Sequence, residues 1–278
     1  MDLKWWNSNL YTGDLRKLKS TLSDPVQYYL PIGEVELPLN GCLGKIVTLK
    51  FLGDIQCVHC QRKIKKSYSQ GYCFPCAQTL ARCDFCIVKP EKCHFHLGTC
   101  REPEWGKIHC FIPHIVYLAN TSGLKVGITR ETQIPTRWID QGAVQALPIF
   151  RVKNRYHSGL VEVVMKSMVA DKTDWRKMLK GQAENLALFE KRDELLKKIE
   201  WPNDLRDENA IEILQNQNVV SIQYPILSYP EKVTAFNIEK TREISGTLLG
   251  IKGQYLIFDK GVLNIRNLTG YNISFFSD

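Results

Sequence analysis

The sequence predicts an α+β protein that combines a cysteine-rich module, a hairpin-and-helix core and a small β-barrel-like region. Eight of the ten cysteines lie within residues 57–100, two short apolar runs and a turn precede helix-like segments after residue 114, and strand-like runs occupy both ends. The chain therefore divides into 1–56, an N-terminal extension and strands that pack with the C-terminal strands; 57–110, the cysteine module; 111–218, the core with its helices; and 219–278, the barrel-like region.

The composition is that of a globular protein rather than a membrane or secreted one. A chain of 278 residues with 44% hydrophobic and 24% charged residues has ordinary globular values and can bury a sizeable core. It contains no uncharged apolar run of about 18 residues, and its first residues, MDLKWWNSNLYTGDLRK, lack the apolar centre of a secretion signal. We expect no membrane span, no secretion and a cytoplasmic location, where dense cysteines indicate metal ligands rather than disulfides.

The net charge of +8 is unevenly distributed. Residues 1–110 carry 15 basic and 10 acidic side chains, residues 111–180 carry 11 and 5, and residues 181–278 carry 11 and 14. A surplus confined to the cysteine-rich and hairpin regions is typical of a nucleic-acid surface, although other moderately basic proteins share it. We expect a nucleic-acid partner, with RNA slightly preferred because a metal module beside a barrel-like region suits recognition of shape and single strands.

Strand-like segments with Gly and Pro turns flank the centre of the chain. QYYLPI, KIVTLKFLG and DIQC precede the cysteines, and SIQYPIL, KVTAFNI, GTLLGIKGQYLIF and GVLNIRNLTGYNISFF follow the helical middle. Short strands with regular turns favour a small barrel or curved sheet. We expect the N-terminal strands to complete it, with the cysteine and helical parts inserted between its halves.

The first four cysteines have the spacing of a zinc ribbon. Two Cys-x2-Cys pairs are separated by twelve residues, and each pair suits a tight knuckle that contributes two thiolates to a tetrahedral Zn²⁺ site. The expected ligands are Cys57, Cys60, Cys73 and Cys76. Four protein ligands leave no open position for water, so this zinc is expected to be structural.

Basic and aromatic residues alternate between the two knuckles, in QRKIKKSYSQGY. Arginine and lysine bind phosphates, and tyrosine stacks on bases, so a metal-pinned loop of this composition suits nucleic acid. The alternative, to which the sequence gives equal weight, is a hairpin whose charged residues are simply solvated. The candidate contacts here are Arg62, Lys63, Lys65 and Lys66.

A second zinc site is expected within CDFCIVKPEKCHFHLGTC, which gives about two zinc ions per chain. The most economical ligand set is Cys83, Cys86, Cys93 and Cys100. Either of the last two ligands is open to replacement by His94, His96, His109 or Cys110, because zinc accepts thiolate and imidazole alike.

The core begins with two apolar runs, residues 115–118 and 125–128, joined by Asn-Thr-Ser-Gly, a pattern that predicts a hairpin. A basic helix-like segment follows, then a strand at 146–152. Helical spacing of apolar residues predicts helices over 158–168 and 171–201, the second with Trp175, Leu179, Leu186, Phe189 and Leu196 as its core stripe. Further basic residues of this region, Arg130, Arg151 and Arg155, are candidate nucleic-acid contacts.

These residues resemble the GIY-YIG nuclease motif, in which a hairpin precedes a helix with an essential arginine. Tyr117 matches the first tyrosine of that motif, Gly127 the last glycine and Arg137 the helix arginine, whereas Lys125 replaces the second tyrosine. The sequence of residues 57–181, with the segments GTCR, KVGITR and RWIDQGA, also resembles a bacterial family catalogued as a domain of unknown function. That resemblance implies an arrangement of segments along the chain but no activity.

The GIY-YIG resemblance implies phosphodiester hydrolysis with a divalent ion such as Mg²⁺, held by a glutamate on a later helix. Glu162 is the candidate, Arg137 would hold the phosphate, and Tyr117 would orient or deprotonate water. Lys125 would either bind phosphate or indicate that a nuclease scaffold has been reused to bind a nucleotide or to carry out another reaction on it. We expect a zinc-containing protein that binds structured RNA or DNA at this site; the alternatives are a Mg²⁺-dependent phosphodiesterase and a tRNA-base-modifying enzyme.

Overall fold

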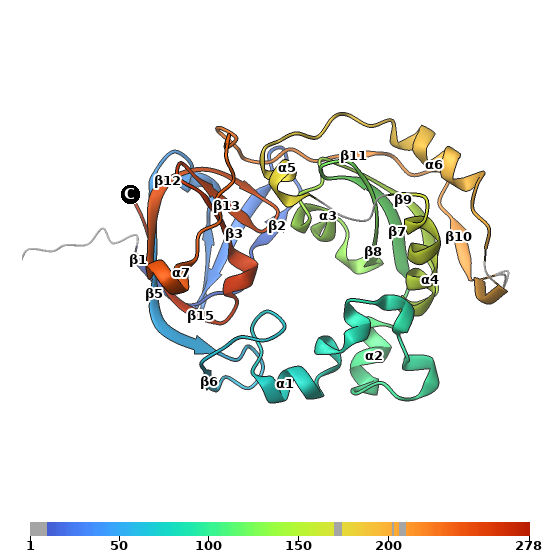
Figure 1. Cartoon of the computed structure of the whole chain (residues 1–278), viewed down its shortest axis with the longest axis horizontal. Coiled ribbons are helices and arrows are strands. Elements are labelled where there is room, and N and C mark those ends of the chain that lie inside the picture. Colours follow the sequence, from blue (N-terminus) through green and yellow to red (C-terminus); the bar gives the residue numbers. More distant parts are fainter. Residues whose placement is uncertain (1–9, 170–173, 202, 206–209) are drawn as a thin grey trace, which may run out of the picture. The chain divides into compact units, whose positions relative to one another are not determined.

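The computed structural model describes residues 10–169, 174–201, 203–205 and 210–278 (Figure 1). The chain separates into two compact units. Unit 1 joins Met1–Cys76 with Gln223–Asp278, and unit 2 is Ala77–Ile222. Both contain sheets and short helices, so the α+β class is confirmed, with several small sheets. The first nine residues of the expected N-terminal extension lie outside the described part of the chain.

Unit 1 is organised around one long strand, β5. Two strands from the C-terminal part of the chain flank it, because β5 pairs antiparallel with β15 on one side and with β12 on the other. The order of the main sheet is β1-β15-β5-β12-β13-β14, and β6 pairs with the end of β5. Its strands are β1 Leu10–Asp14, β5 Ile46–Gln56, β6 Lys63–Ile64, β12 Glu243–Lys252, β13 Tyr255–Phe258, β14 Val262–Asn264 and β15 Tyr271–Ser277.

The expected runs KIVTLKFLG and DIQC form this single strand, whereas QYYLPI forms a strand of a separate sheet. Gly53 has a φ of 99°, which L-residues rarely adopt, and it allows β5 to continue from the first run into the second. Inward-facing residues of β5, β12 and β15 are buried, including Leu49, Ile251 and Phe275.

A small sheet and short helices complete unit 1. The sheet has the order β2-β3-β4, with β2 Lys19–Thr21, β3 Gln27–Ile32 and β4 Val35–Pro38. A bridge between Leu15 and Ile32 links it to the end of β1. The short helices are η1 Asn40–Cys42, α7 Ile238–Thr241 and η8 Ile265–Leu268; α1, Phe74–Thr79, begins in this unit. Much of 221–238, expected as strands, forms only β11 and isolated bridges.

Unit 2 contains an antiparallel sheet with the order β10-β9-β7-β8, and β11 also pairs with β9. Its strands are β7 His114–Asn120, β8 Leu124–Arg130, β9 Gln145–Val152, β10 Ile211–Ile213 and β11 Val220–Ser221. Its α-helices are α2 Pro103–His109, α3 Thr136–Asp140, α4 Arg155–Lys166, α5 Trp175–Leu179 and α6 Leu188–Leu196. Short 3₁₀ turns precede α2, of which η3 Phe85–Ile87 and η4 Pro90–Lys92 matter below.

The core of unit 2 lies between the sheet and two helices. Val161 and Met165 of α4 and Leu188 and Leu195 of α6 are buried against the apolar residues of β7, β8 and β9. The helix expected over 171–201, whose residues 171–173 lie outside the described part of the chain, is wrong as one element, because α5 and α6 are separate helices. Gly181, with a φ of 68°, follows the end of α5, and α6 begins at Leu188 with a shifted face that leaves Phe189 42% exposed.

No helix within the described ranges is both long and apolar enough to cross a bilayer.

Candidate functional site

The first four predicted ligands converge in unit 1. The Sγ atoms of Cys57, Cys60, Cys73 and Cys76 all lie within 4.8 Å of one another. The Cys60 and Cys73 sulfurs are 3.7 Å apart, close to the roughly 3.8 Å between thiolates around a tetrahedral zinc with Zn–S bonds of about 2.3 Å. This donor set fits zinc, and all four positions belong to protein thiols.

The knuckles also supply groups that stabilise thiolates. Burial raises the pKa of the Cys57 thiol, but backbone N–H groups of Cys60, Cys73 and His59 outweigh it and lower that pKa to about 6. A hydrogen bond with Cys60 raises the pKa of the Arg62 guanidinium. Arg62 therefore faces the metal cluster, although it was a candidate phosphate ligand.

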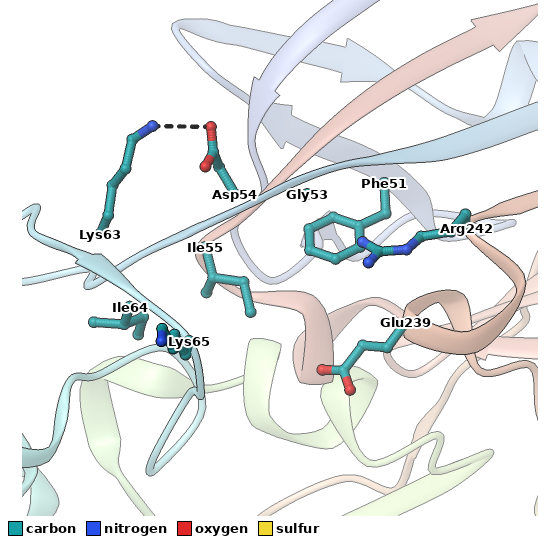
Figure 2. A pocket seen from close by; sticks show the side chains of 9 residues that line it. All are labelled: Phe51, Gly53, Asp54, Ile55, Lys63, Ile64, Lys65, Glu239 and Arg242. Carbon is teal, nitrogen blue, oxygen red and sulfur yellow. Dashed lines mark hydrogen bonds and ion pairs between the residues drawn. The ribbon is translucent and has the colours of Figure 1, made fainter.

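Two lysines of the inter-knuckle loop, Lys63 and Lys65, line a cavity of about 620 Å³ in unit 1 (Figure 2). Lys63 reaches Asp54 across 3.1 Å, and Lys65 lines the same cavity. Lys66 lies over the Tyr68 ring, 5.3 Å from its centroid. The loop thus presents two lysines to a cavity and one to an aromatic ring.

Two residues that the sequence analysis missed line the opposite part of that cavity. Arg242 and Glu239 are drawn in Figure 2, and the Arg242 guanidinium lies 5.0 Å from the Phe51 ring centroid. Glu239 also accepts a hydrogen bond from Tyr271. They come from α7 and its C-cap, nearly 180 residues after the loop in the sequence. No local sequence pattern indicates that Glu239 and Arg242 line the same cavity as the inter-knuckle lysines.

The hairpin of unit 2 positions Tyr117. The hairpin is confirmed, and its register places Tyr117 opposite Gly127. The tyrosine ring is fully buried and meets Trp138 edge-on, with the ring centroids 5.9 Å apart. Burial raises the pKa of Tyr117 to about 12 despite the nearby Arg137 charge, so the phenol is protonated at neutral pH.

Gln141 connects Tyr117 to Arg137. When its amide oxygen faces Arg137, that oxygen accepts hydrogen bonds from Nε at 3.2 Å and Nη2 at 3.1 Å, and its amide nitrogen donates to the tyrosine Oη at 3.0 Å. Arg137 lies on α3 and Gln141 is the C-cap of that helix, and positions four apart lie on one face of a helix.

Glu162 lies on α4, the helix after β9. Its side chain is 12% exposed and lies 3.5 Å from Lys166 Nζ, one turn later. The Glu162 charge raises the pKa of Tyr117, so the carboxylate belongs to the same neighbourhood. We call Tyr117, Arg137, Gln141 and Glu162 the hairpin site. It draws on β7, α3 and α4.

The other predicted basic residues have different surroundings. Arg151 forms ion pairs with Glu131 and Glu212, at 3.3 and 3.6 Å. Arg155 donates to the backbone carbonyls of residues 86 and 87, a structural role. Half-buried Lys125 pairs with Ala119 across the hairpin, on the same face as Tyr117.

The second group of cysteines meets in unit 2 with a membership that differs from the expected set. Cys86, Cys93 and Cys110 form a buried cluster, and Cys100 lines the same small cavity. Cys83 is not among the residues that line this cavity. Cys110, which the sequence offered only as a replacement ligand, is central.

Comparison with known proteins gives a family and no activity. A family model described as a protein of unknown function (DUF2797) matches residues 44–273, which include both cysteine clusters and the hairpin site. No curated protein and no solved structure matches the chain.

Proposed function

We propose that this chain, which belongs to the DUF2797 family of proteins of unknown function, is a zinc-containing protein that binds nucleic acid at the hairpin site. The observation that carries the proposal is the link Arg137–Gln141–Tyr117 on β7 and α3, with the Glu162 charge beside it. A guanidinium held by an amide in a fixed orientation suits bidentate contact with a phosphate.

The order of elements supports the same proposal. A hairpin is followed by a short helix with an arginine, then a strand, then a helix with a glutamate, the layout that the GIY-YIG resemblance implies. Residues 111–180, which contain this site, carry 11 basic against 5 acidic side chains. Such a surplus attracts polyanions by counterion release from their phosphates.

Binding is favoured over cleavage by the state of Tyr117. A phenol that is fully buried and has a pKa of about 12 is a poor general base at neutral pH. The second tyrosine of the nuclease motif is replaced by Lys125, which adds a positive charge suited to holding phosphate.

A Mg²⁺-dependent phosphodiesterase is the second candidate, and Glu162 is the observation that favours it. Its carboxylate and the Arg137 guanidinium both act on Tyr117, and a carboxylate is the kind of ligand that Mg²⁺ takes. In that reaction Glu162 would hold the ion and Arg137 would bind the phosphate.

One experiment separates these functions. A structured RNA hairpin and a DNA duplex are titrated with wild-type protein, Arg137→Ala, Glu162→Gln and the control Lys197→Ala, an exposed residue in the same unit. We expect Arg137→Ala to weaken binding by about 10- to 100-fold, the value of a charge-assisted contact of about 1.5–3 kcal/mol. Glu162→Gln should bind equally or more tightly, and Lys197→Ala should change little.

The same mixtures are then incubated with Mg²⁺. Intact substrate with all four proteins supports a binding protein, whereas cleavage that Glu162→Gln abolishes establishes the phosphodiesterase. If wild type fails to bind RNA and DNA at low salt, the proposal is overturned.

A further inference from the structure

Four cysteines of unit 2 line one cavity of about 10 Å³, which is about the least space that can hold a single water. Cys86 belongs to η3, Cys93 follows η4, Cys100 precedes α2, and Cys110 follows the end of α2. Cys86, Cys93 and Cys110 are buried, and Cys100 is half-buried. A site this small admits one ion among the sulfurs.

The sulfurs approach one another through Cys93. Its thiol interacts with the thiols of Cys110 and Cys86, and the three residues form one buried cluster. Cys100 also approaches α2, where its Sγ lies 3.2 Å from the position that a Cβ on Gly106 would take. Gly106 is one turn before Cys110, and its absent side chain leaves room for the Phe95 ring and for Cys100 beside the cluster.

The nearest alternative ligands already have strong partners. Asp84 accepts from the Cys86 N–H at 2.9 Å and pairs with Arg101 at 2.7 Å. The Nδ1 atom of His94 shares a hydrogen bond with Thr99 Oγ1 at 2.7 Å, and its Nε2 faces Asp84 at 3.7 Å. Asp84, Cys86 and His94 lie close enough to form a rival metal site, but binding there would break this network.

Two arginines place positive charge beside the thiols. Arg155 donates to the Ile87 carbonyl at 2.6 Å and acts electrostatically on Cys93. Arg130 is half-buried, is near Cys110, and is repelled by Arg155. Zinc bound by four thiolates has a net charge of about −2, which would offset both guanidinium groups.

We propose that Cys86, Cys93, Cys100 and Cys110 form a second structural zinc site, in which Cys110 takes the place that sequence spacing gives to Cys83. Four protein ligands close the site to water. The zinc holds η3, η4 and α2 together, and Arg155 connects this module to the first turn of α4. The site thereby supports the helix that bears Glu162.

Zinc content of matched variants tests the ligand set. Elemental analysis of protein purified without chelator should give about two zinc ions for wild type and for Cys83→Ser, but about one for Cys110→Ser. The opposite result, zinc lost from Cys83→Ser and kept by Cys110→Ser, would overturn the proposal.

X-ray absorption at the zinc edge on wild-type protein provides a second measurement that does not depend on a variant's folding. We expect only sulfur in the first shell, at about 2.3 Å. Nitrogen or oxygen ligands would assign zinc to Asp84 or His94 instead, and a content of one zinc per wild-type chain would remove the second site. Neither measurement involves nucleic acid, so each stands whether or not the hairpin site binds it.

Discussion

Tyr117 and Gly127 face each other across the β7–β8 hairpin, and a Cβ atom on Gly127 would lie 2.5 Å from the Tyr117 Cζ atom. The tyrosine ring therefore lies against the bare backbone of β8. The φ of Gly127 is not in the left-handed region, so backbone conformation does not require a glycine there. The close approach of the Tyr117 ring does. The pair fixes the place of the Tyr117 hydroxyl in the hairpin site.

We predict that Gly127→Ala destabilises unit 2. The added methyl group overlaps a buried ring that has no room to move, which costs about 1–3 kcal/mol in well-packed cores. Urea unfolding measures the change. Gly41→Ala is the control, because a Cβ there meets no atom within 4 Å, and it should change stability by less than about 0.5 kcal/mol. Equal stability of both variants would show that the ring does not pack on Gly127.

Gly159 is a second glycine at a close contact, between α4 and η4. A Cβ there would lie 2.1 Å from the Glu91 backbone nitrogen, which is part of the cysteine module of unit 2. We predict that Gly159→Ala separates α4 from that module and speeds zinc release to a coloured chelator. If zinc release matches that of wild type, the contact does not support the metal site.

The hairpin and the first zinc cluster could be predicted because their signals are local. Residues 115–118 and 125–128 read as strands around a turn, and the paired Cys-x2-Cys spacing fixes which thiols can meet. Glu162 was proposed through the GIY-YIG resemblance, as the one acidic residue of 155–170, and its role at the hairpin site stays a prediction.

Contacts between distant segments could not be predicted. Arg242 meets the inter-knuckle loop only through the sheet around β5, and Arg155 turns toward the cysteine module because carbonyls of η3 lie within 3.2 Å. The apolar residues of 171–201 have helical spacing throughout, which predicted one helix. The segment instead forms two helices, α5 and α6, which bury different faces. Spacing alone also favoured Cys83 over Cys110, since tertiary folding decides which cysteines line a cavity.

The first zinc cluster gives a prediction about folding. Cys57→Ser removes one of four converging thiols, and structural zinc binding supplies folding free energy in small modules. We expect loss of one zinc and a lower melting temperature. A variant that keeps the wild-type zinc content and melting temperature would contradict the assignment of Cys57 as a ligand.

The inter-knuckle lysines give a prediction about salt. If Lys63, Lys65 and Lys66 contact phosphates, replacing all three with alanine should reduce the slope of log affinity against log salt by about 2–3. The control is Lys197→Ala with Lys198→Ala, two exposed lysines at the end of α6. A slope equal to that of wild type would exclude the loop from the nucleic-acid interface.

Lys252 gives a prediction about pH. It lies at the end of β12 with 0% of its surface exposed, and its Nζ is 5.2 and 5.6 Å from the ring centroids of Tyr224 and Tyr229. Within the described part of the chain, this Nζ has no hydrogen-bond partner. Burial lowers the pKa of Lys252 from 10.5 to about 8, since the charged form loses its hydration.

The sign of the effect follows from proton binding. Between pH 8 and 10.5 the unfolded chain keeps a proton that the folded chain releases, so the contribution of Lys252 to stability rises with pH across that window. Below it, the full cost of burying the charge is present, at most about 3 kcal/mol. Lys252→Met should therefore stabilise the protein at neutral pH, and the gain should shrink at about pH 9.5.

Urea unfolding at both pH values measures this gain, with Lys232→Met as the control because Lys232 is exposed in the same unit. The control should change stability little and equally at the two pH values. If Lys252→Met destabilises the protein at neutral pH, the attraction between the ammonium group and the two tyrosine rings exceeds the cost of its burial.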